Sequence, residues 1–188
     1  MGVLTGSAIR EAVAEGLIEI SPFILEHVGP NSVDLRLSKV LKVYPIVSRD
    51  SRITSPLVRD QYLDMRSENK VVSFEIPDEG YILLPGVLYL GCTMERTKTD
   101  HFIPKVEGRS SVGRLGIKVH LTAGFGDIGF DGRWTLEIEV THPVRVYAGE
   151  RVCQVYFSTP HGKVKDLYRG RYQGDLEPRE SRFHEKRN

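Results

Sequence analysis

The densest cluster of cationic and hydroxyl side chains lies between Glu107 and Gly116, in the sequence EGRSSVGRLG. This segment combines two arginines and two serines with three glycines. Glycines let backbone N–H groups approach an anion, hydroxyls donate hydrogen bonds, and arginines bind phosphate oxygens in pairs. The spacing matches neither a Walker A loop nor the GxGxxG of dinucleotide-binding proteins. By residue type alone, the segment fits either a phosphate site or an exposed loop with solvated arginines.

A candidate general base lies in an alternating sequence at residues 134–141. The alternation predicts a half-buried strand with one apolar and one polar face. The two faces consist of Trp134, Leu136, Ile138 and Val140, and of Thr135, Glu137, Glu139 and Thr141. On such a strand, Glu137 would be held rigidly enough to move a proton. An isolated strand carboxylate is more often only solvated, so its role depends on its neighbours.

Residues 122–132, TAGFGDIGFDG, separate two strand-like runs and are rich in Gly, Asp and Phe. This composition predicts an unusual hairpin connection. Taken alone, it is better explained by a plain turn with hydrophobic anchors.

The histidines and cysteines exclude several kinds of metal site. The six histidines form neither an HxxxH nor an HxE pattern, and no CxxC is present. Zinc-dependent nucleobase deaminases need an HxE motif and a later PCxxC. Cys92 and Cys153 stand far apart in apolar runs, so we expect two buried, free thiols and no disulfide framework. Any deamination by this chain would be zinc-independent.

The composition indicates one ordinary globular domain of 188 residues, with 40% hydrophobic and 27% charged residues. The net charge of +1 argues against nucleic-acid binding by bulk charge. No apolar run approaches the roughly 18 residues of a membrane-spanning helix, and the first residues lack a signal-peptide core. We therefore expect a cytoplasmic location and neither a nucleic-acid nor a membrane partner.

The elements that position these residues are mostly strands. Ser7 could cap a short helix that ends at Gly16, whereas the sequence from Val33 alternates as a strand does. Short apolar runs separated by Pro, Gly, Asn and Asp continue to about residue 160 and predict an all-β sandwich or barrel. Residues 48–70 suggest a polar excursion from this β core. Residues 162–188 form a basic tail that is expected to be mobile.

Taken together, these motifs resemble the dCTP deaminase family of the dUTPase superfamily. The resemblance rests on the two segments above, on Leu136-Glu137, on PNSVDLRL at residues 30–37 and on GRYQG at residues 170–174. It spans nearly the whole chain in the family's order. It implies a distorted, dUTPase-like β-barrel with a short N-terminal helix, assembled as a homotrimer with active sites at subunit interfaces.

The resemblance also implies a substrate and its cofactor. It implies binding of dCTP or dUTP, with Mg²⁺ held by the substrate phosphates and not by side chains. The tail at residues 162–188 would then act as a lid over the nucleotide. Feedback inhibition by dTTP is common in the family.

The resemblance assigns catalytic roles to four residues. Glu137 would activate a water that attacks C4 of cytosine, and Ser110 and Arg114 would order that water. Asp127 would meet the sugar 3′-hydroxyl. The substrate-binding residues implied by the resemblance are Arg109, Ser110, Ser111, Val112, Gly113, Arg114, Asp127, Phe130, Thr135, Leu136, Glu137, Gln154, Tyr168, Arg171 and Asp175.

Individual positions in that set carry specific expectations. The ring of Phe130 would pack under deoxyribose, and residues 135–137 would read the base. Gln154, Tyr168 and Arg171 would lie around the phosphates. Asp175 departs from the family pattern, because it places an acid where a glutamine commonly follows Tyr-Gln-Gly.

Gly124 bears on whether the reaction ends at dUTP or at dUMP. Gly-Phe after Thr-Ala resembles the bifunctional, dUMP-forming members, and we expect Gly124 to free space where a second water could attack the α-phosphate. The alternatives are a monofunctional deaminase that releases dUTP, a dUTPase only, and a catalytically silent nucleotide-binding trimer.

Overall fold

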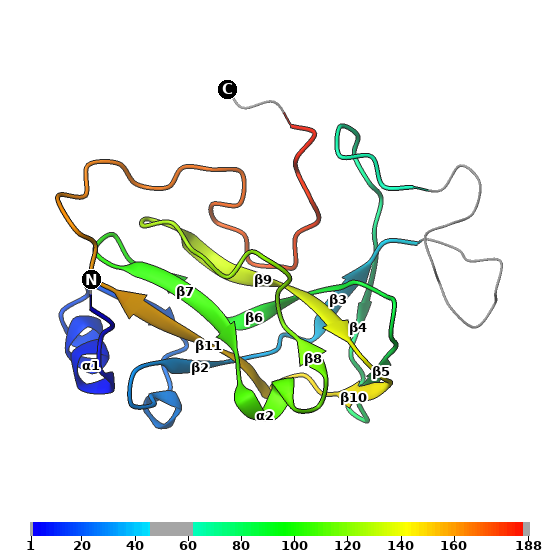
Figure 1. Cartoon of the computed structure of the whole chain (residues 1–188), viewed down its shortest axis with the longest axis horizontal. Coiled ribbons are helices and arrows are strands. Elements are labelled where there is room, and N and C mark those ends of the chain that lie inside the picture. Colours follow the sequence, from blue (N-terminus) through cyan, green and yellow to red (C-terminus); the bar gives the residue numbers. More distant parts are fainter. Residues whose placement is uncertain (1, 46–61, 186–188) are drawn as a thin grey trace.

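A computed structural model describes residues 2–45 and 62–185 (Figure 1). The chain begins with helix α1 (Gly6–Ala14), whose first turn is capped by Thr5 Oγ1, the acceptor of a 3.3 Å hydrogen bond from the Ala8 N–H. The expectation that Ser7 caps the helix is wrong, because Ser7 already lies in its first turn. Gly16 follows the helix with a φ of 72°, a conformation that favours glycine and ends a helix.

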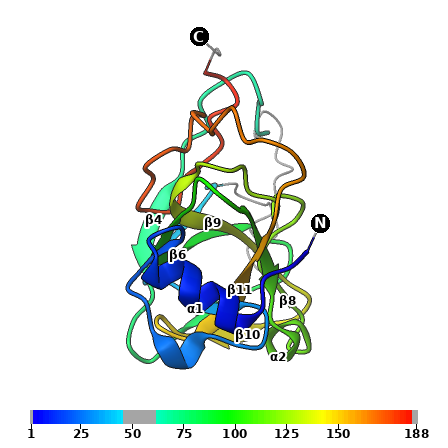
Figure 2. The ribbon, with the colours of Figure 1, turned by 90° about the vertical axis from the view of Figure 1, so that its left-hand side faces the viewer.

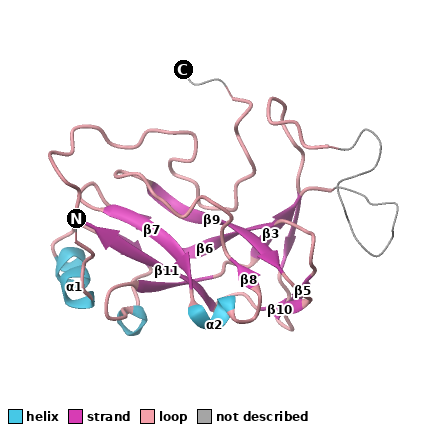
Figure 3. Cartoon of the chain, viewed as in Figure 1, coloured by secondary structure: helices cyan, strands magenta, loops and turns pink. Residues whose placement is uncertain are grey.

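Nearly all remaining regular structure in the described residues is β. The strands are β1 (Glu19–Ser21), β2 (Val33–Arg36), β3 (Val40–Val43), β4 (Val72–Glu75), β5 (Tyr81–Leu83), β6 (Tyr89–Lys98), β7 (Ile103–Gly108), β8 (Ile117–Lys118), β9 (Asp131–Val140), β10 (Val144–Val146) and β11 (Arg151–Ser158). A 3₁₀ turn, η1 (Leu25–His27), and a short helix, α2 (Ser110–Gly113), interrupt them. The all-β prediction is confirmed (Figure 3).

The strands form separate sheets around one core. The largest sheet has the order β4-β3-β6-β9-β8, with β1 added to β6, and a second sheet has the order β2-β11-β7. Strands β5 and β10 form a third, two-stranded sheet. Figures 1 and 2 both place α1 and α2 on one side of the sheets and the tail on the other.

Strand β9 shows how the sequence pattern becomes burial. Its residues alternate between buried and half-buried along the whole strand, as the alternation predicts. The apolar face of β9 packs into the core with side chains such as Leu35 and Phe157. Glu137 is therefore held on a strand whose opposite face is fixed by the core.

Cys92 and Cys153 are free and fully buried, and burial raises the pKa of the Cys92 thiol to about 11.

The two irregular segments expected from the sequence are described only in part. Residues 46–61 and 186–188 lie outside the described residues, so most of the expected excursion at 48–70 does too. Residues 62–70 form a turn, in which the Asp64 N–H donates to Asn69 Oδ1 at 3.0 Å. The tail from residue 162 to residue 185 contains neither helix nor strand and crosses the sheets beside β9 (Figure 1).

Candidate active site

A pocket of about 540 Å³ opens between β9, the β8–β9 connection and the tail. One wall is the polar face of β9, and a second is formed by tail residues. Its described lining residues are Tyr44, Leu63, Leu88, Leu90, Leu121, Ala123, Phe125, Gly126, Asp127, Phe130, Arg133, Trp134, Thr135, Glu137, Tyr168, Tyr172, Asp175, Arg179, Glu180 and Ser181. The pocket thus combines an apolar, aromatic interior with a few polar groups, which is typical of a small-molecule site.

Glu137 lies on the pocket wall because the period of β9 turns its side chain away from the core. Its Oε2 accepts a 3.0 Å hydrogen bond from the backbone N–H of Leu121, in the β8–β9 connection. Two residues earlier, Thr135 Oγ1 accepts a 3.0 Å hydrogen bond from the backbone N–H of Arg179 in the tail. The polar face of β9 therefore links the two segments that flank the pocket.

An aromatic cluster lines the pocket next to these polar groups. The Phe130 ring lies 5.0 Å from the Trp134 ring and 6.0 Å from the Tyr168 ring, between centroids. The Trp134 indole is fixed by a 2.8 Å hydrogen bond from its Nε1 to Thr97 Oγ1. Gly129 has a φ of 89°, and an added Cβ would lie 2.7 Å from Leu167, so glycine allows the tail to approach Phe130 closely. Phe130 thus presents a fixed apolar surface for a flat or ring-shaped ligand.

Gly124 packs closely against β7. A Cβ at this position would lie 2.5 Å from the Val106 carbonyl oxygen and 2.9 Å from His120 Nε2. The Gly124 carbonyl also accepts a 2.8 Å hydrogen bond from the Val106 N–H. This glycine is therefore needed for close packing of the connection against β7, and room for an attacking water beside it stays a prediction.

The tail is held on β9 mainly through backbone groups. The Gly174 N–H donates to the Asp131 carbonyl at 2.8 Å, and the Arg133 N–H donates to the Asp175 carbonyl at 2.8 Å. The side-chain amide of Gln173 makes two further hydrogen bonds. Its Nε2 donates to the Gly129 carbonyl at 2.9 Å, and its Oε1 accepts from the Asp131 N–H at 3.2 Å. These bonds resemble those of an added strand at the edge of β9 and place the tail over the pocket.

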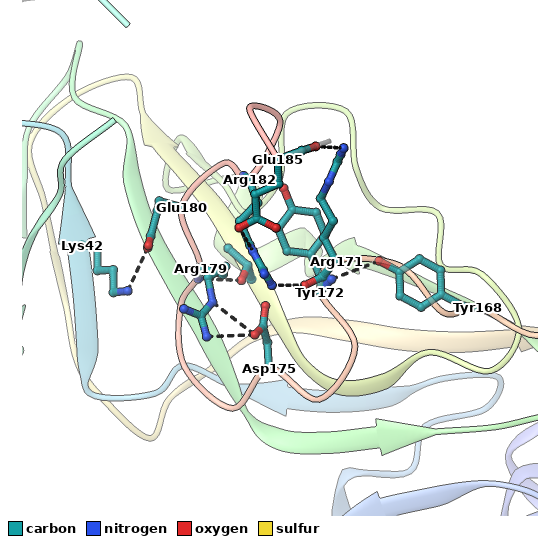
Figure 4. Close-up of polar contacts among 10 residues, drawn as sticks. Lys42, Tyr168, Arg171, Tyr172, Asp175, Arg179, Glu180, Arg182 and Glu185 are labelled. Atoms are coloured by element: carbon teal, nitrogen blue, oxygen red, sulfur yellow. Dashed lines mark hydrogen bonds and ion pairs between the residues drawn. The ribbon is translucent and has the colours of Figure 1, made fainter. Parts of the chain in front are cut away.

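The side chains of the tail form ion pairs, shown in Figure 4. Asp175 Oδ1 accepts hydrogen bonds from Arg179 Nε and Nη2 at 3.1 and 3.0 Å. Arg182 pairs with Glu185 at 2.6 Å. The guanidinium of Arg171 donates to the Glu185 carbonyl oxygen and does not line the pocket. Of the tail residues expected at the site, Tyr168 and Asp175 therefore lie in the pocket wall and Arg171 lies beside it.

The segment at residues 109–114 lies elsewhere on this chain. Ser110–Gly113 form the short helix α2 instead of the expected loop, and none of residues 109–114 lines the pocket. The side chains of Ser110, Ser111 and Arg114 are exposed. Figures 1 and 2 show α2 on the side of the sheets remote from the tail.

A second polar cluster surrounds this segment. Arg109 Nε pairs with Asp34 Oδ1 at 2.9 Å, and Arg151 Nη1 pairs with Asp34 Oδ2 at 3.2 Å. Gln154 Nε2 donates to the Gly108 carbonyl at 3.2 Å, and Gln154 Oε1 accepts from Ser32 Oγ at 2.8 Å. The expected phosphate residues Arg109 and Gln154 thus lie together, apart from the pocket that contains Glu137.

The charge of the pocket differs from that of this second cluster. The described lining contains four carboxylates, Asp127, Glu137, Asp175 and Glu180, but only two guanidiniums, those of Arg133 and Arg179. Around Asp34, by contrast, the two guanidiniums of Arg109 and Arg151 face a single carboxylate. The pocket therefore carries an excess of carboxylates, whereas the cluster around Asp34 carries an excess of guanidiniums.

Two cationic residues of the pocket, Arg133 and Arg179, are not among those predicted from the sequence. Arg133 shares the polar face of β9 with Glu137, so extending the alternation by one step towards the N-terminus would have found it. No local pattern indicated Arg179, whose place depends on its contacts with Asp175 and Thr135. Leu136 is buried on the core face, so only its backbone can take part in binding.

The described residues contain no cluster of three or more His, Cys, Asp or Glu side chains that could together bind a metal ion. Within the same residues, no helix has the length and apolarity needed to cross a membrane.

Comparisons with known proteins agree with the fold and the motifs. A family model described as dCTP deaminase-like matches residues 3–159. The "dCTP deaminase, dUMP-forming" of Leptospira biflexa is 44% identical over 173 residues, which cover 92% of this chain and 91% of that protein. The protein of the same name from Clostridium acetobutylicum is 40% identical, again over 92% of this chain and 91% of its own length.

A solved structure shows the same similarity in three dimensions. The crystal structure of 2′-deoxycytidine 5′-triphosphate deaminase from Agrobacterium tumefaciens matches with a TM-score of 0.59 and 27% identity. The match covers 85% of this chain and 49% of that one, so this chain spans about half of its length. The family match at residues 3–159 includes β9 and the segment at 109–114 but ends before the tail.

Proposed function

Because the chain belongs to the dCTP deaminase-like family, we propose that it deaminates dCTP at C4 and then hydrolyses the dUTP to dUMP and diphosphate. The product dUMP would supply dTTP synthesis. The observation that carries this proposal is the similarity to dUMP-forming deaminases at 40–44% identity over 92% of the chain. The carboxylate of Glu137, which lines a pocket of about 540 Å³, supports the deamination step.

In the first reaction, Glu137 acts as the general base. It takes a proton from a water as the oxygen attacks C4, and a tetrahedral intermediate forms. The same carboxylate then passes protons on, so that one proton of the water ends on N3 of the ring and the other on the departing amino group, and ammonia leaves as C4 becomes a carbonyl. The net change is dCTP plus water to dUTP plus ammonia. The bond from Leu121 leaves Glu137 Oε1 available for this water.

The second reaction is an attack of water at the α-phosphorus, which releases diphosphate and leaves dUMP. Asp127, which lines the same pocket, would meet the sugar and orient this water. A monofunctional deaminase that releases dUTP and a dUTPase are the alternatives. The curated relatives, which are named dUMP-forming, favour the two-step reaction.

We propose that the active chain is a homotrimer with sites shared between subunits. Ser110 and Arg114 are exposed and do not line the pocket of their own chain, which supports their insertion into the pocket of a neighbouring copy. There they would order the water beside Glu137, while Arg109, Ser111 and Gln154 would bind phosphates. Val112 and Gly113 would offer backbone groups to the same nucleotide.

The proposed nucleotide substrate also implies a metal ion, a role for the tail and a form of regulation. Mg²⁺ would arrive on the phosphates of dCTP and neutralise part of their charge. The tail at residues 162–188 would close over the bound nucleotide, with Tyr168 and Arg171 beside it, as part of one domain spanning residues 1–188. We further propose a cytoplasmic enzyme, open to feedback by dTTP, without nucleic-acid or membrane partners.

One experiment tests the proposed function directly. The protein is incubated with dCTP and Mg²⁺, and dCTP, dUTP, dUMP and ammonia are then separated and quantified. Equal amounts of dUMP and ammonia are expected. Accumulation of dUTP with ammonia would indicate the monofunctional deaminase. No reaction with dCTP but turnover of dUTP would indicate a dUTPase, and binding without turnover would indicate a nucleotide sensor.

A further inference from the structure

The carboxylate of Asp175 is more deeply buried than a tail anchor requires. The residue is 7% exposed and lines the pocket. One oxygen, Oδ1, accepts both hydrogen bonds from Arg179. The other, Oδ2, is buried and has no hydrogen-bond partner among the described residues. A buried, unsatisfied carboxylate oxygen is unfavourable unless a ligand or water donates to it.

Anchoring of the tail does not explain this side chain. The tail is fixed on β9 by the backbone of residues 174 and 175 and by the Gln173 amide. Those bonds would remain if the side chain of Asp175 ended at Cβ. Asp175 and Phe130 both line the pocket, and both lie close to Gly132, where an added Cβ would meet the Asp175 backbone at 2.9 Å and the Phe130 ring at 3.1 Å.

Charge determines what kind of group Asp175 can contact. A carboxylate repels phosphate, and the described lining of this pocket already has more carboxylates than guanidiniums. A hydrogen-bond donor is the complementary partner. A deoxycytidine nucleotide carries two such donors on its nucleoside part, the exocyclic amino group of the base and the sugar 3′-hydroxyl.

We propose that Asp175 Oδ2 accepts a hydrogen bond from a donor on the nucleoside and that Arg179 is the positioning residue for this carboxylate. The inference rests on the proposed function, since it takes a deoxycytidine nucleotide as the ligand. It replaces the phosphate contact expected for position 175 with a nucleoside contact. The two bonds from Arg179 and the backbone bond from Arg133 fix the direction of Oδ2.

The test measures binding of three nucleotides to the Glu137→Gln protein, which should not deaminate them. The probes are α,β-imido triphosphates of deoxycytidine, deoxyuridine and 2′,3′-dideoxycytidine, with Mg²⁺, titrated by calorimetry. Each affinity is compared with that of the same protein carrying Asp175→Asn. Asparagine keeps the size of the side chain but directs an N–H towards the donor.

The expected result is a loss that depends on the nucleoside. Deoxycytidine triphosphate should bind at least about tenfold more weakly, as for a lost charge-assisted hydrogen bond. If the amino group is the donor, the deoxyuridine nucleotide should escape this loss. If the 3′-hydroxyl is the donor, the dideoxy nucleotide should escape it. The same factor for all three nucleotides, or no change, would overturn the proposal.

Two further variants separate this contact from general effects on the tail. Arg179→Gln leaves the carboxylate in place without its two bonds, and we expect the same nucleoside dependence with a smaller loss. This variant also carries the test if Asp175→Asn does not fold. Glu185→Gln removes a tail carboxylate that pairs with Arg182 outside the pocket lining, and it should leave all three affinities unchanged.

The two proposals can fail separately. If the Glu137→Gln protein binds none of the three nucleotides and the unmodified chain does not convert dCTP, the proposed function is wrong. If the nucleotides bind and the loss on Asp175→Asn is uniform, only the role of Asp175 is wrong.

Discussion

The backbone N–H of Leu121 donates a 3.0 Å hydrogen bond to Glu137 Oε2, so the β8–β9 connection fixes the carboxylate of the neighbouring strand. No other hydrogen bond to this carboxylate is found among the described residues, so Oε1 has no partner there, and Glu137 lines the pocket. A general base benefits from such an arrangement, because one oxygen is oriented while the other can accept a proton.

Replacement of Glu137 by Gln should abolish deamination and preserve binding of dCTP. The amide keeps the shape and the bond from Leu121 but cannot take the proton, a loss commonly worth ~10²–10⁴-fold in rate. Ammonia release from dCTP measures this step. Hydrolysis of supplied dUTP should survive in part, because that attack occurs at phosphorus and not at C4.

Glu139→Gln is the matched control for this variant. Glu139 lies on the same face of β9 but pairs with Lys118 at 3.4 Å and does not line the pocket. It should deaminate at a near-native rate. A near-native rate for Glu137→Gln instead would contradict the mechanism.

Mixed oligomers should reveal whether the active site is shared between subunits. Glu137→Gln and Arg114→Ala should each be inactive alone. Co-refolded, they should recover part of the activity, because some interfaces then combine an intact Glu137 with an intact Arg114. Light scattering should give a mass near three times 21.2 kDa. An active monomer, or two inactive variants that never complement, would rule out shared sites.

Deletion of the chain from Arg169 onward should abolish turnover and leave the fold and the trimer intact. The deletion removes the wall of the pocket formed by Tyr172, Asp175 and Arg179 but none of the core strands. Turnover assays, far-UV circular dichroism and light scattering measure the three properties. Full activity of the truncated protein would show that the tail is not a lid.

The closed tail should open more readily in acid. Glu180 pairs with Lys42 of β3 at 2.9 Å. Burial raises the pKa of Glu180, but the hydrogen bond and charge of Lys42 outweigh it and hold this pKa below its ordinary value of 4.5. A carboxylate with a lowered pKa stabilises the closed tail above pH 4.5 and loses this contribution as the pH falls through the lowered value.

Hydrogen exchange of the tail amides, corrected for intrinsic rates, measures this opening. Lys42→Met should increase exchange at neutral pH, and its difference from the unmodified chain should narrow on acidification. A difference that does not depend on pH would show that the ion pair does not hold the tail.

The sequence predicted well what is encoded in local periodicity. The alternation at residues 134–141 is confirmed, and with it the orientation of Glu137 and Thr135 away from the core. The bond from Leu121 to Glu137 could not be predicted, because it joins a backbone group of an irregular connection to a side chain 16 positions away. Periodicity defines faces of a strand but not the loops that reach them.

For the tail, the sequence indicated the local character of the segment but not its position in the fold. Its composition predicted a mobile basic segment, and the structure shows residues 162–185 without helix or strand but docked on β9. Composition could not indicate where the tail lies, because backbone N–H and C=O groups make most of its bonds to β9 and every residue type offers them. Arg179 reaches the pocket only because the tail docks on β9, so no local sequence pattern could indicate it.

The docking of the tail also bears on solubility. Residues 174 and 175 occupy the outer edge of β9 through the Asp131 carbonyl and the Arg133 N–H. An uncovered strand edge is a template for pairing with another polypeptide. Each opening of the tail to admit or release a nucleotide therefore exposes these backbone groups of β9, and they can then pair with another polypeptide. A bound ligand that keeps the tail closed would then act against aggregation as well as taking part in catalysis.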